Sequence, residues 1–363
     1  MSALDIIQIK GFKSIRDTEK LSLRRLNVLI GSNGAGKTNF VSVFKLLNHI
    51  VEKRLQIFVA QSGGANSFLH FGSKVTSSIE IRLNFGQNSY VIELSPSQDD
   101  SFVFTKEICY FKSPQYSKPY SENLGAGHKE TQLVEEIRRN SGKVAGYVFN
   151  NLSGWKVYHF HDTSDSAKVK QTGDISDNAI LRSDASNLAA FLYWMRETRR
   201  DHYELLVKTI RLAAPFFDDF NLRPSPLNNK KIQLEWREKG SDSYFNAHTL
   251  SDGTLRFICL STLLLQPTLP STILIDEPEL GLHPYAITLL ADLLQSAAEK
   301  TQVVVSTQSV PLVNQFTPED IIVVDREDGQ SIFRQLDKQS TEHWLEEYGL
   351  GDLWEKNIIG GRP

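Results

Sequence analysis

The chain has 363 residues, of which 40 are Lys or Arg and 43 are Asp or Glu, so its formal net charge is −3. This length allows a large α/β core with an inserted subdomain. The balanced charge excludes a molecule that is basic over its whole surface and attracts nucleic acid everywhere. The two cysteines, Cys109 and Cys259, lie among apolar neighbours, which indicates buried thiols in a reducing cytosol.

The first predicted strands cover residues 4–10 and 26–30, joined through residues 11–16, and we expect them in one sheet. Residues 1–10 alternate between apolar and polar and lack the long hydrophobic segment of a signal peptide. The sequence therefore predicts a cytoplasmic protein without a membrane association.

A glycine-rich motif follows the second strand directly. Its residues are Gly31, Ser32, Asn33, Gly34, Ala35, Gly36, Lys37 and Thr38, and a helix-like segment begins at Asn39. In such a strand, loop and helix, the glycines let backbone N–H groups surround a polyphosphate, Lys37 adds a charge, and the Thr38 hydroxyl can ligate magnesium. The motif predicts binding of ATP with Mg²⁺, and we assign Asn39 to the same nucleotide site.

The next elements are β-strands. Apolar residues alternate in 79–85 and in 90–94 around the turn at 86–88, which predicts a hairpin. Further strands are predicted over residues 102–111 and 155–160. Residues 113–129 are rich in Pro, Gly, Ser and Tyr without a sustained period, which predicts a loop.

Residues 187–212 are predicted to form one helix, because apolar residues recur there every three to four positions. Its basic residues offer a surface for DNA or a partner, although a solvated helix face explains them as well. They are Arg196, Arg199, Arg200, His202, Lys208 and Arg211.

The most apolar stretch, residues 257–275, is close to membrane-spanning length, but Gln266, Pro267 and Pro270 interrupt it. We predict a buried helix followed by a buried strand. This strand ends in Asp276 and Glu277, a pair in which the first carboxylate can hold magnesium and the second can polarise the attacking water.

Two polar loops flank this strand in the sequence. Residues 250–254 contain Ser251 and Gly253 and precede an apolar helix, where a hydroxyl and a helix N-terminus favour an anion; a plain N-cap of the helix is the simpler interpretation of Ser251. A buried strand over residues 303–305 ends in polar residues that include Gln308, at the edge where α/β sheets place ligands.

Together, residues 9–15, the phosphate loop, and residues 250–254, 276–284 and 303–309 resemble the RecF-like branch of the ABC/SMC ATPases. This branch overlaps the ATPase heads of the overcoming-lysogenisation-defect (OLD) family and of prokaryotic anti-phage defence systems. The resemblance covers residues 1–44 and 245–326. It implies an α/β fold: an ABC/SMC-type P-loop ATPase head with an N-terminal β-rich lobe and a compact inserted mixed α/β region.

The resemblance also implies roles for single residues. Thr38 and Asp276 would serve Mg²⁺, Glu277 would activate water, and Lys37 with the loop amides would hold the phosphates. Ser251 and Gly253 would act on the nucleotide of a second subunit, in a homodimer with two nucleotides between its heads. Lys13 and Ser14 would approach the base or ribose, and Gln61 or Gln171 would supply a metal-contacting glutamine. Gln308 stands where most such heads have a histidine, which implies slow turnover because an amide does not titrate.

The expected function is a nucleotide-driven dimeric switch that controls a separately encoded effector, a nuclease, in anti-phage defence. The alternative is a RecF-like DNA-binding ATPase of recombination and repair, since DNA or RNA binding stays open. A transporter subunit is disfavoured by residues 11–14 and by the long insertion. Heptad repeats of long coiled-coil arms are missing, and residues 325–363 are too few for the TOPRIM nuclease domain of OLD proteins.

We expect four regions: the N-terminal part of the head with the phosphate loop (1–85), the inserted region (86–240), the C-terminal part of the head (241–340) and an aromatic tail (341–363). The tail carries an apolar stripe that either docks on the head or binds the effector. The stripe consists of Trp344, Leu345, Tyr348, Leu350, Leu353 and Trp354.

Overall fold

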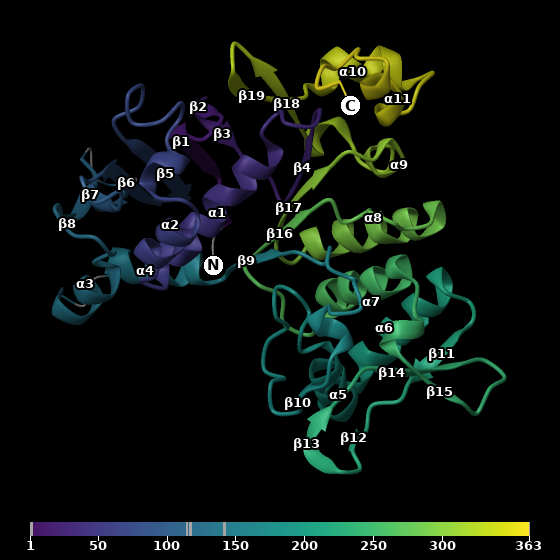
Figure 1. The fold of residues 1–363 in the computed structure, drawn as a ribbon. Coiled ribbons are helices and arrows are strands. Elements are labelled where there is room, and N and C mark those ends of the chain that lie inside the picture. Colours follow the sequence, from purple (N-terminus) through teal and green to yellow (C-terminus); the bar gives the residue numbers. More distant parts are fainter. Residues whose placement is uncertain (1–2, 114, 116–117, 141–142, 363) are drawn as a thin grey trace.

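The computed structural model describes residues 3–113, 115, 118–140 and 143–362, and a six-stranded sheet lies at its centre (Figure 1). In sheet order, its strands are β19 (Gln330–Gln335), β18 (Ile321–Glu327), β4 (Leu26–Ile30), β17 (Gln302–Thr307), β16 (Thr272–Asp276) and β9 (Trp155–Tyr158). Neighbours from β18 to β9 run parallel, whereas β19 runs antiparallel to β18. The residues that follow the parallel strands therefore meet at one edge.

Both faces of this sheet are buried, and they belong to two different hydrophobic cores. Leu29, Leu274 and Val304 face the N-terminal core, whereas their neighbours Val28, Ile275 and Val305 face the other core. A strand that is covered on both sides reads as a continuous apolar run. This explains why the predicted strands at 26–30 and 272–276 lack polar alternation and why they are confirmed.

An antiparallel sheet forms the N-terminal lobe, on the left in Figure 1. Its order is β2-β1-β5-β6-β7-β8, and β3 pairs with β1. The strands are β1 (Ile6–Phe12), β2 (Ile15–Asp17), β3 (Leu21–Ser22), β5 (Ile79–Phe85), β6 (Asn88–Pro96), β7 (Phe102–Phe111) and β8 (Tyr120–Gly125). The predicted hairpin at 79–94 is confirmed, with Phe85 opposite Asn88 across its turn.

The expectation that the first two predicted strands share a sheet is wrong. β1 pairs with β5 in the antiparallel sheet, while β4 lies between β18 and β17 in the parallel one. The burial patterns give the reason, because β1 alternates between buried and half-buried residues, whereas all five residues of β4 are buried.

The predicted loop at 113–129 is wrong in part, because it contains β8. This strand pairs with β7, placing Tyr120 opposite Phe111 and Glu122 opposite Cys109. Since β8 is the last strand of the sheet, much of it is exposed and it lacks the apolar alternation of an inner strand. Residues 114, 116 and 117 of this segment lie outside the described residues.

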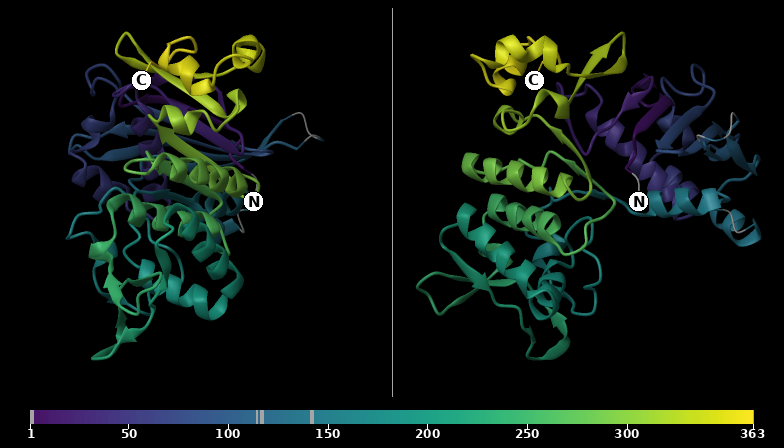
Figure 2. Two further views of the ribbon diagram at one scale, coloured as in Figure 1. Left: turned by 90° about the vertical axis from the view of Figure 1, so that its right-hand side faces the viewer. Right: turned by 180° about the vertical axis from the view of Figure 1, so that it is seen from behind.

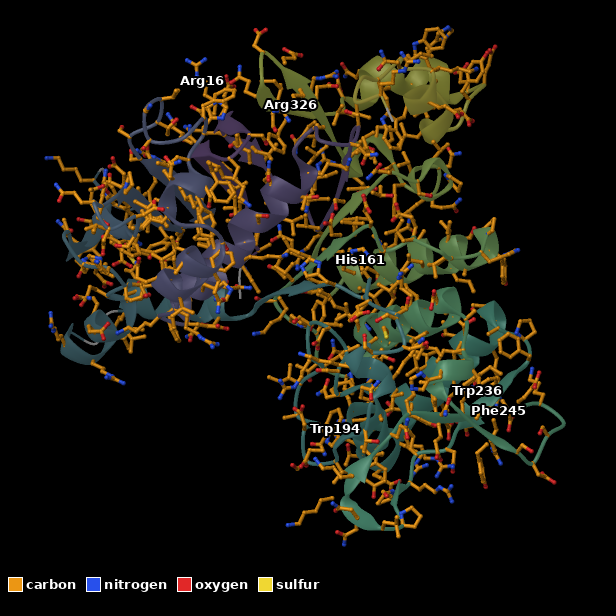
Figure 3. The ribbon with its side chains drawn as sticks, viewed as in Figure 1. Arg16, His161, Trp194, Trp236, Phe245 and Arg326 are labelled. Carbon is orange, nitrogen blue, oxygen red and sulfur yellow. The ribbon has the colours of Figure 1, made fainter. Side chains whose placement is uncertain are left out.

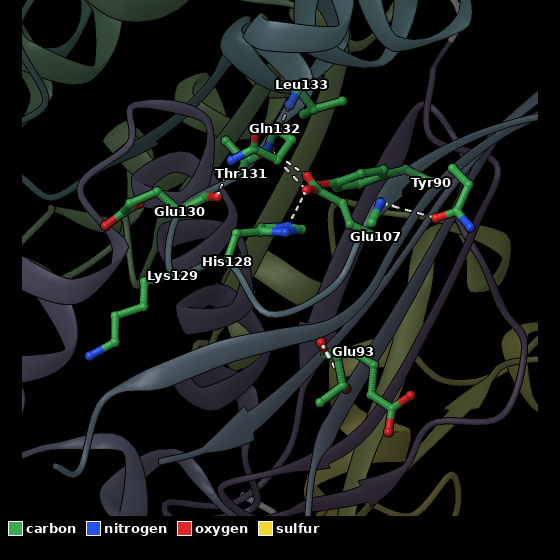
Figure 4. A network of polar contacts seen from close by, with 12 residues as sticks. Tyr90, Glu93, Glu107, His128, Lys129, Glu130, Thr131, Gln132 and Leu133 are labelled. Atoms are coloured by element: carbon green, nitrogen blue, oxygen red, sulfur yellow. Dashed lines mark hydrogen bonds and ion pairs between the residues drawn. The ribbon is translucent and has the colours of Figure 1, made fainter. Parts of the chain in front are cut away.

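Helices cover the N-terminal sheet and connect it to the centre. They are α1 (Lys37–Val51), α2 (Leu55–Gln61), α3 (Leu133–Asn140) and α4 (Lys143–Ser153), with a short 3-10 helix at Ala65–Phe68. The segment before α3 is anchored on β7 by the buried carboxylate of Glu107 (Figure 4). Tyr90 donates a hydrogen bond to Glu107 at 2.6 Å, His128 Nε2 lies 2.8 Å away, and the backbone N–H of Gln132 donates at 3.0 Å.

The inserted unit lies at the bottom of Figure 1 and packs beneath helix α7 (Asp252–Leu265), which begins in the polar loop at residues 250–254, called the signature loop below. Its elements are β10 (Gly173–Asp174), α5 (Leu188–Thr198), α6 (Arg200–Ala213), β11 (Phe217–Phe220), β12 (Pro224–Ser225), β13 (Asn228–Ile232), β14 (Glu235–Glu238), β15 (Tyr244–Asn246) and 3-10 helices at Lys168–Lys170 and Ala247–Thr249. Trp236 and Phe245, neighbours in Figure 3, join β14 to β15 through rings 5.2 Å apart.

The single helix predicted over 187–212 is wrong, because the structure has two helices that break at Arg199. The backbone of Arg199 has φ −140° and ψ 56°, outside the helical region. Apolar periodicity continues across the break because α5 and α6 bury residues in the same core, so the sequence pattern does not reveal it.

The C-terminal half adds α8 (Pro284–Ala298), α9 (Val310–Val313), a 3-10 helix at Pro318–Asp320, α10 (Lys338–Leu345) and α11 (Leu350–Glu355). Figure 2 shows from two other sides that the tail lies at the top, the parallel sheet, α8 and α7 lie below it, and the inserted unit lies at the bottom. Residues 257–275 form the buried helix and strand that were predicted. Across the described residues, no helix is long and apolar enough to cross a membrane.

The sheet assignments bear on the expected division of the chain. The expected boundary at residue 86 lies in the turn of the β5–β6 hairpin, whose two strands belong to one sheet. We therefore propose that the N-terminal lobe extends to about residue 160 and that the inserted unit starts after β9.

Candidate functional site

The phosphate loop lies between β4 and α1, and its glycines are required by backbone conformation and, at Gly36, by the lack of space for a side chain. Gly36 has φ 120°, and a Cβ atom on it would lie 2.0 Å from Ser331 Oγ. Gly34 has φ 78°, a left-handed conformation that L side chains rarely adopt. The loop therefore follows a tight backbone path, and any larger residue at Gly36 would clash with Ser331.

Lys37 begins α1 and its side chain is buried, with 5% exposure. Its ammonium group donates to the carbonyl of Gly31 and, at 3.1 Å, to that of Ser32. Burial lowers the pKa of Lys37, whereas the carboxylates of Glu277, Asp276 and Glu279 oppose this shift. The charged group is thus held inside the loop by neutral carbonyl partners, which a phosphate oxygen can replace.

Thr38 and Asp276 lie at the same edge, with Thr38 Oγ1 3.5 Å from Asp276 Oδ2. Ser306, at the end of β17, donates a hydrogen bond to the other carboxylate oxygen, Asp276 Oδ1. This contact orients the carboxylate so that Oδ2 points toward Thr38. Hydroxyl and carboxylate oxygens are ligands that Mg²⁺ prefers, so the donor set fits magnesium.

Glu277 and Gln308 form a second polar contact beside this pair. Gln308 Nε2 donates to Glu277 Oε1, and the Glu277 backbone has φ 44°, a left-handed conformation unusual for a residue with a side chain. The N–H of Glu277 donates to Ser306 O at 2.8 Å. Backbone strain at this position directs the Glu277 carboxylate toward the loop that carries Gln308.

Glu279 was not expected in the site, yet it lies beneath these residues and is 7% exposed. Its Oε1 accepts hydrogen bonds from the Thr307 hydroxyl and, at 3.1 Å, from the backbone N–H of Gln308, while its Oε2 has no partner among the described residues. Burial raises the pKa of Glu279. The two acids, Glu277 and Glu279, therefore hold Gln308 by its side chain and by its backbone.

Ser14 and Asn39 meet on the other side of the phosphate loop. Asn39 Nδ2 donates to Ser14 Oγ at 2.7 Å, and Ser14 Oγ lies 2.7 Å from Ser331 Oγ. Ser331 in turn donates to Ala35 O at 2.6 Å. The β1–β2 turn and β19 are thereby joined to the loop.

Two basic residues lie around this network. The ammonium group of Lys13 lies 5.4 Å from the ring centre of Phe68, and burial lowers its pKa. Arg326 of β18 donates to Gly34 O at 3.0 Å, and Figure 3 shows it on the same side of the molecule as Arg16. Arg326 is a loop contact that the sequence did not indicate, because its β-strand is far from the motif in the chain.

The signature loop at 250–254 caps α7. The Ser251 hydroxyl accepts the N–H of Thr254 at 3.2 Å, so the N-cap interpretation of Ser251 is confirmed. A Cβ atom on Gly253 would lie 2.2 Å from Gly281 O, which makes the glycine necessary for the close approach of these two loops. Both residues line a hollow of about 120 Å³ together with His283 and Phe257. In the described part of the chain, the residues that line this hollow do not include any residue of the phosphate loop.

His159 is the main site residue that the sequence analysis missed. It follows β9, whose Tyr158 pairs with Ile275, so His159 lies beside Asp276. Its Nε2 atom is buried without a partner among the described residues. Burial, together with the positive charge of Lys45, lowers the pKa of His159 to about 4.

Neither Gln61 nor Gln171, the two candidates for a metal-contacting glutamine, has a hydrogen bond to Asp276 or Thr38 among the described residues. Gln171 donates to Asp165 O at 3.0 Å, and Gln61 ends α2 on the N-terminal lobe. The sequence offered one signal for His159, a histidine that directly follows a predicted strand. The sequence did not show that this strand, β9, pairs with β16, which ends in Asp276.

Arg256, on the first turns of α7, joins the signature loop to the rest of the site. Its guanidinium donates to Phe160 O at 3.0 Å, to His161 O at 3.2 Å and to Leu280 O. These carbonyls belong to the segments that follow His159 and Glu279, and Figure 3 shows His161 where the parallel sheet meets the inserted unit. One side chain therefore connects α7 to both segments.

Two solved structures of Smc heads share this fold. One, an SmcHead bound to the C-winged helix domain of ScpA, has a TM-score of 0.61 at 14% identity and covers 93% of this chain and 99% of that chain. The other, from Pyrococcus furiosus, is an Smc head domain with an extended coiled coil bound to the C-terminal domain of ScpA; it has a TM-score of 0.57 at 14% identity and covers 96% and 99%. The ABC/SMC-type head fold predicted from the sequence is confirmed.

Sequence comparison gives the same class. A protein of Methanosarcina acetivorans named "Putative ABC transporter ATP-binding protein" is 30% identical over 105 residues, and the match spans 28% of this chain and 37% of that relative. A family model described as "AAA domain, putative AbiEii toxin, Type IV TA system" matches residues 26–314. This range holds the phosphate loop, the two acids after β16 and Gln308, and the chain therefore belongs to this family, as an ABC/SMC-like P-loop ATPase.

Proposed function

We propose that this protein binds ATP with Mg²⁺, hydrolyses it slowly, and uses the nucleotide to pair two copies of itself into a switch. The observation that carries the proposal is the convergence of Lys37, Thr38, Asp276, Glu277 and Gln308 at one edge of the parallel sheet, where β4, β16 and β17 end. Each of these groups has a part in phosphoryl transfer to water.

In the proposed reaction, Lys37 exchanges its carbonyl partners for the phosphate oxygens, and the loop N–H groups surround the remaining charge. Thr38 and Asp276 would hold Mg²⁺, which neutralises the charge that develops on the phosphates. Glu277 accepts the proton of the attacking water, and Gln308, held by its contact with Glu277, keeps that carboxylate aligned. Because Gln308 cannot titrate, it donates a hydrogen bond without moving a proton, which supports slow turnover.

The pairing of two copies follows from the position of the signature loop. Ser251 and Gly253 line their own hollow, and the N-terminus of α7 offers free N–H groups to an anion. A second copy, placed head to tail, would bring this loop to the phosphates held by the first. Arg256 would then transmit the closure to the segments beside His159 and Glu279.

We further propose that the switch controls a separately encoded effector, a nuclease, in anti-phage defence. The family description names a toxin of a type IV toxin–antitoxin system, which supports a role in bacterial defence. Surfaces open to such an effector include the half-exposed Trp344 of the tail and the inserted unit, where Leu227 is 99% exposed.

The alternative, DNA binding in repair, depends on the basic residues of α5 and α6. Three of the four arginines already have acidic partners: Arg196 lies 3.0 Å from Glu197, Arg200 2.9 Å from Glu204, and Arg211 3.2 Å from Asp218. A groove of about 490 Å³ along α6 has both charges on its walls. This neutralisation favours the solvated-face interpretation over a phosphate-binding surface.

Phosphate release by the purified protein in MgATP tests the proposal. We expect slow hydrolysis that Lys37→Ala abolishes together with ATP binding, and that Gln308→Ala lowers about tenfold while ATP binding is retained. Gln295→Ala, on the exposed side of α8, is the control and should behave as the wild type. Unchanged turnover in Gln308→Ala would show that this residue is only structural, and a wild type that does not bind MgATP would refute the proposed function.

A further inference from the structure

The end of the tail returns to the phosphate loop. After α11, residues 356–361 run along β18, and the N–H of Gly361 donates to Asp325 Oδ1 at 2.7 Å. The indole N–H of Trp354 donates to Gly361 O, and Arg334 donates to Ile359 O at 3.1 Å. Figure 1 shows this end of the chain beside β18 and above α9.

Gly361 packs directly against the first glycine of the loop. A Cβ atom on Gly361 would lie 2.7 Å from Val323 Cγ1 and 3.5 Å from Gly31 Cα, and Gly361 has φ 66°. On its other side, Gly31 is confined by β18, because a Cβ atom on Gly31 would lie 2.2 Å from Val324 O. The backbone where β4 turns into the phosphate loop is therefore enclosed between β18 and the tail.

The other end of the same tail packs behind Gln308. The N–H of Gly351, in α11, donates to Asn314 Oδ1 at 2.6 Å, and a Cβ atom on Gly351 would lie 2.5 Å from Val310 O. Val310 begins α9, two residues after Gln308. One short segment of chain thus contacts the backbone of both loops that carry the nucleotide-facing residues Lys37 and Gln308.

Packing rather than charge holds this segment in place. Trp354 and Leu353 are fully buried, with 0% exposure, and Leu350 is 3% exposed. The ion pair between Arg334 and Asp325 is 3.5 Å long and partly exposed, so solvent weakens it. The segment is a fixed part of the head that can transmit a small displacement between the loops it touches.

We propose that residues 350–361 are a positioning element for the ATPase site, in which Gly361 sets the phosphate loop and Gly351 sets the loop of Gln308. The inference rests on the proposed function, since it assigns each contact to one stage of the ATPase cycle. Displacement of the phosphate loop weakens nucleotide binding, whereas displacement of Gln308 slows the chemical step, because transition-state contacts tolerate little misplacement.

The test compares KM and kcat for MgATP in single-glycine variants of the full chain. Gly361→Ala, which places a methyl group against Val323 and Gly31, should raise KM and the Kd for ATP about tenfold with kcat within about twofold of the wild type. Gly351→Ala, which places a methyl group against Val310, should lower kcat about tenfold and leave the Kd unchanged. Gly240→Ala is the matched control, because Gly240 also has a positive φ, 79°, but nothing within 4 Å of its Cβ position.

Trp354→Phe provides a second variant if Gly361→Ala does not fold. It keeps a buried aromatic ring but removes the donor to Gly361 O together with the volume of the five-membered ring, so the Kd for ATP should rise about threefold. Variants that are less heat-stable but keep the wild-type KM, kcat and Kd would show that the tail only stabilises the fold, and would overturn the inference. A wild type that fails to bind ATP would instead refute the proposed function.

Discussion

Glu279 is a buried acid whose two carboxylate oxygens have different surroundings. One of its oxygens receives two hydrogen bonds from the loop of Gln308, and the other is buried without a partner among the described residues. Burial therefore opposes its charge, and the folded protein holds it charged at neutral pH only at a cost in stability. A buried acid that holds the loop of Gln308 in this way links its own protonation to the position of Gln308.

This cost gives a pH-dependent prediction for Glu279→Gln. The pKa of Glu279 is raised above its ordinary value of 4.5, so the wild type loses stability as the pH rises from 4.5 through the higher pKa of the folded protein. The variant lacks this loss. The melting temperature of Glu279→Gln minus that of the wild type should become more positive between pH 4 and pH 7.

The new amide N–H groups of Glu279→Gln lower the stability by the same amount at every pH. Only the change with pH of the difference in melting temperature therefore tests the raised pKa. A difference in melting temperature that stays constant, or that falls, with rising pH would contradict the assignment of a raised pKa. Glu93→Gln, at a partly exposed position of β6, serves as the matched substitution of an acid outside the site.

Residue types explain which parts of the site the sequence reveals. Gly34, Gly36 and Lys37 are contiguous, and Asp276 with Glu277 ends an apolar run, so spacing alone indicates them. His159, Glu279 and Arg326 act through strand neighbours far away in the chain, and no local pattern indicates those pairings. Their roles depend on the order of the strands in the parallel sheet.

At the scale of elements, the close approach of α7 to the loop before α8 fixes the position of the signature loop, which we propose contacts the nucleotide of a second copy. Gly253 lies in the first turn of α7, and Gly281 lies opposite it with φ 73°. No side chain fits between them. The contact and the three hydrogen bonds of Arg256 make α7 a rigid support for Ser251.

Gly253→Ala should therefore separate ATP binding from dimer closure. Its methyl group would meet Gly281 O, and such overpacking costs about 1–3 kcal/mol of stability. We expect ATP binding close to that of the wild type, because the phosphate loop is untouched, and hydrolysis reduced at least tenfold. Calorimetry and phosphate release measure the two effects.

Gly146→Ala is the helical control, since the nearest atom to its Cβ position is Ile137 Cγ1 at 3.9 Å, an ordinary contact. If Gly253→Ala hydrolyses ATP as fast as this control, α7 and the loop of Gly281 do not need their close approach for function.

The elements also show where periodicity succeeds and where it fails. Strands β5 to β7 alternate clearly and were predicted within a residue or two, whereas β8 is an exposed edge strand without a pattern. The break between α5 and α6 is invisible because one core buries both helices. β1 belongs to the antiparallel sheet because it pairs with β5, and the closest paired residues, Lys10 and Glu80, are 70 positions apart in the chain.

For the whole molecule, the two hydrophobic cores pack on opposite faces of the parallel sheet. The sheet edge that carries the candidate site is therefore supported from both sides. The tail adds a third support by packing on β18 and α9. None of these long-range contacts follows from the motifs, although the motifs identified the ABC/SMC-type head. A rigid head with an outward-facing signature loop requires a second copy to complete the pocket that we propose.

The mass of Glu277→Gln in solution tests this central claim most directly. This variant keeps the proposed ATP-binding groups and removes the carboxylate that we propose activates water, so in MgATP it should accumulate as a dimer of twice 41.1 kDa, and without nucleotide it should have the mass of one chain. Ser251→Arg in the same background should bind ATP and stay monomeric. A Glu277→Gln protein that binds MgATP but keeps the same mass with and without it would contradict the account.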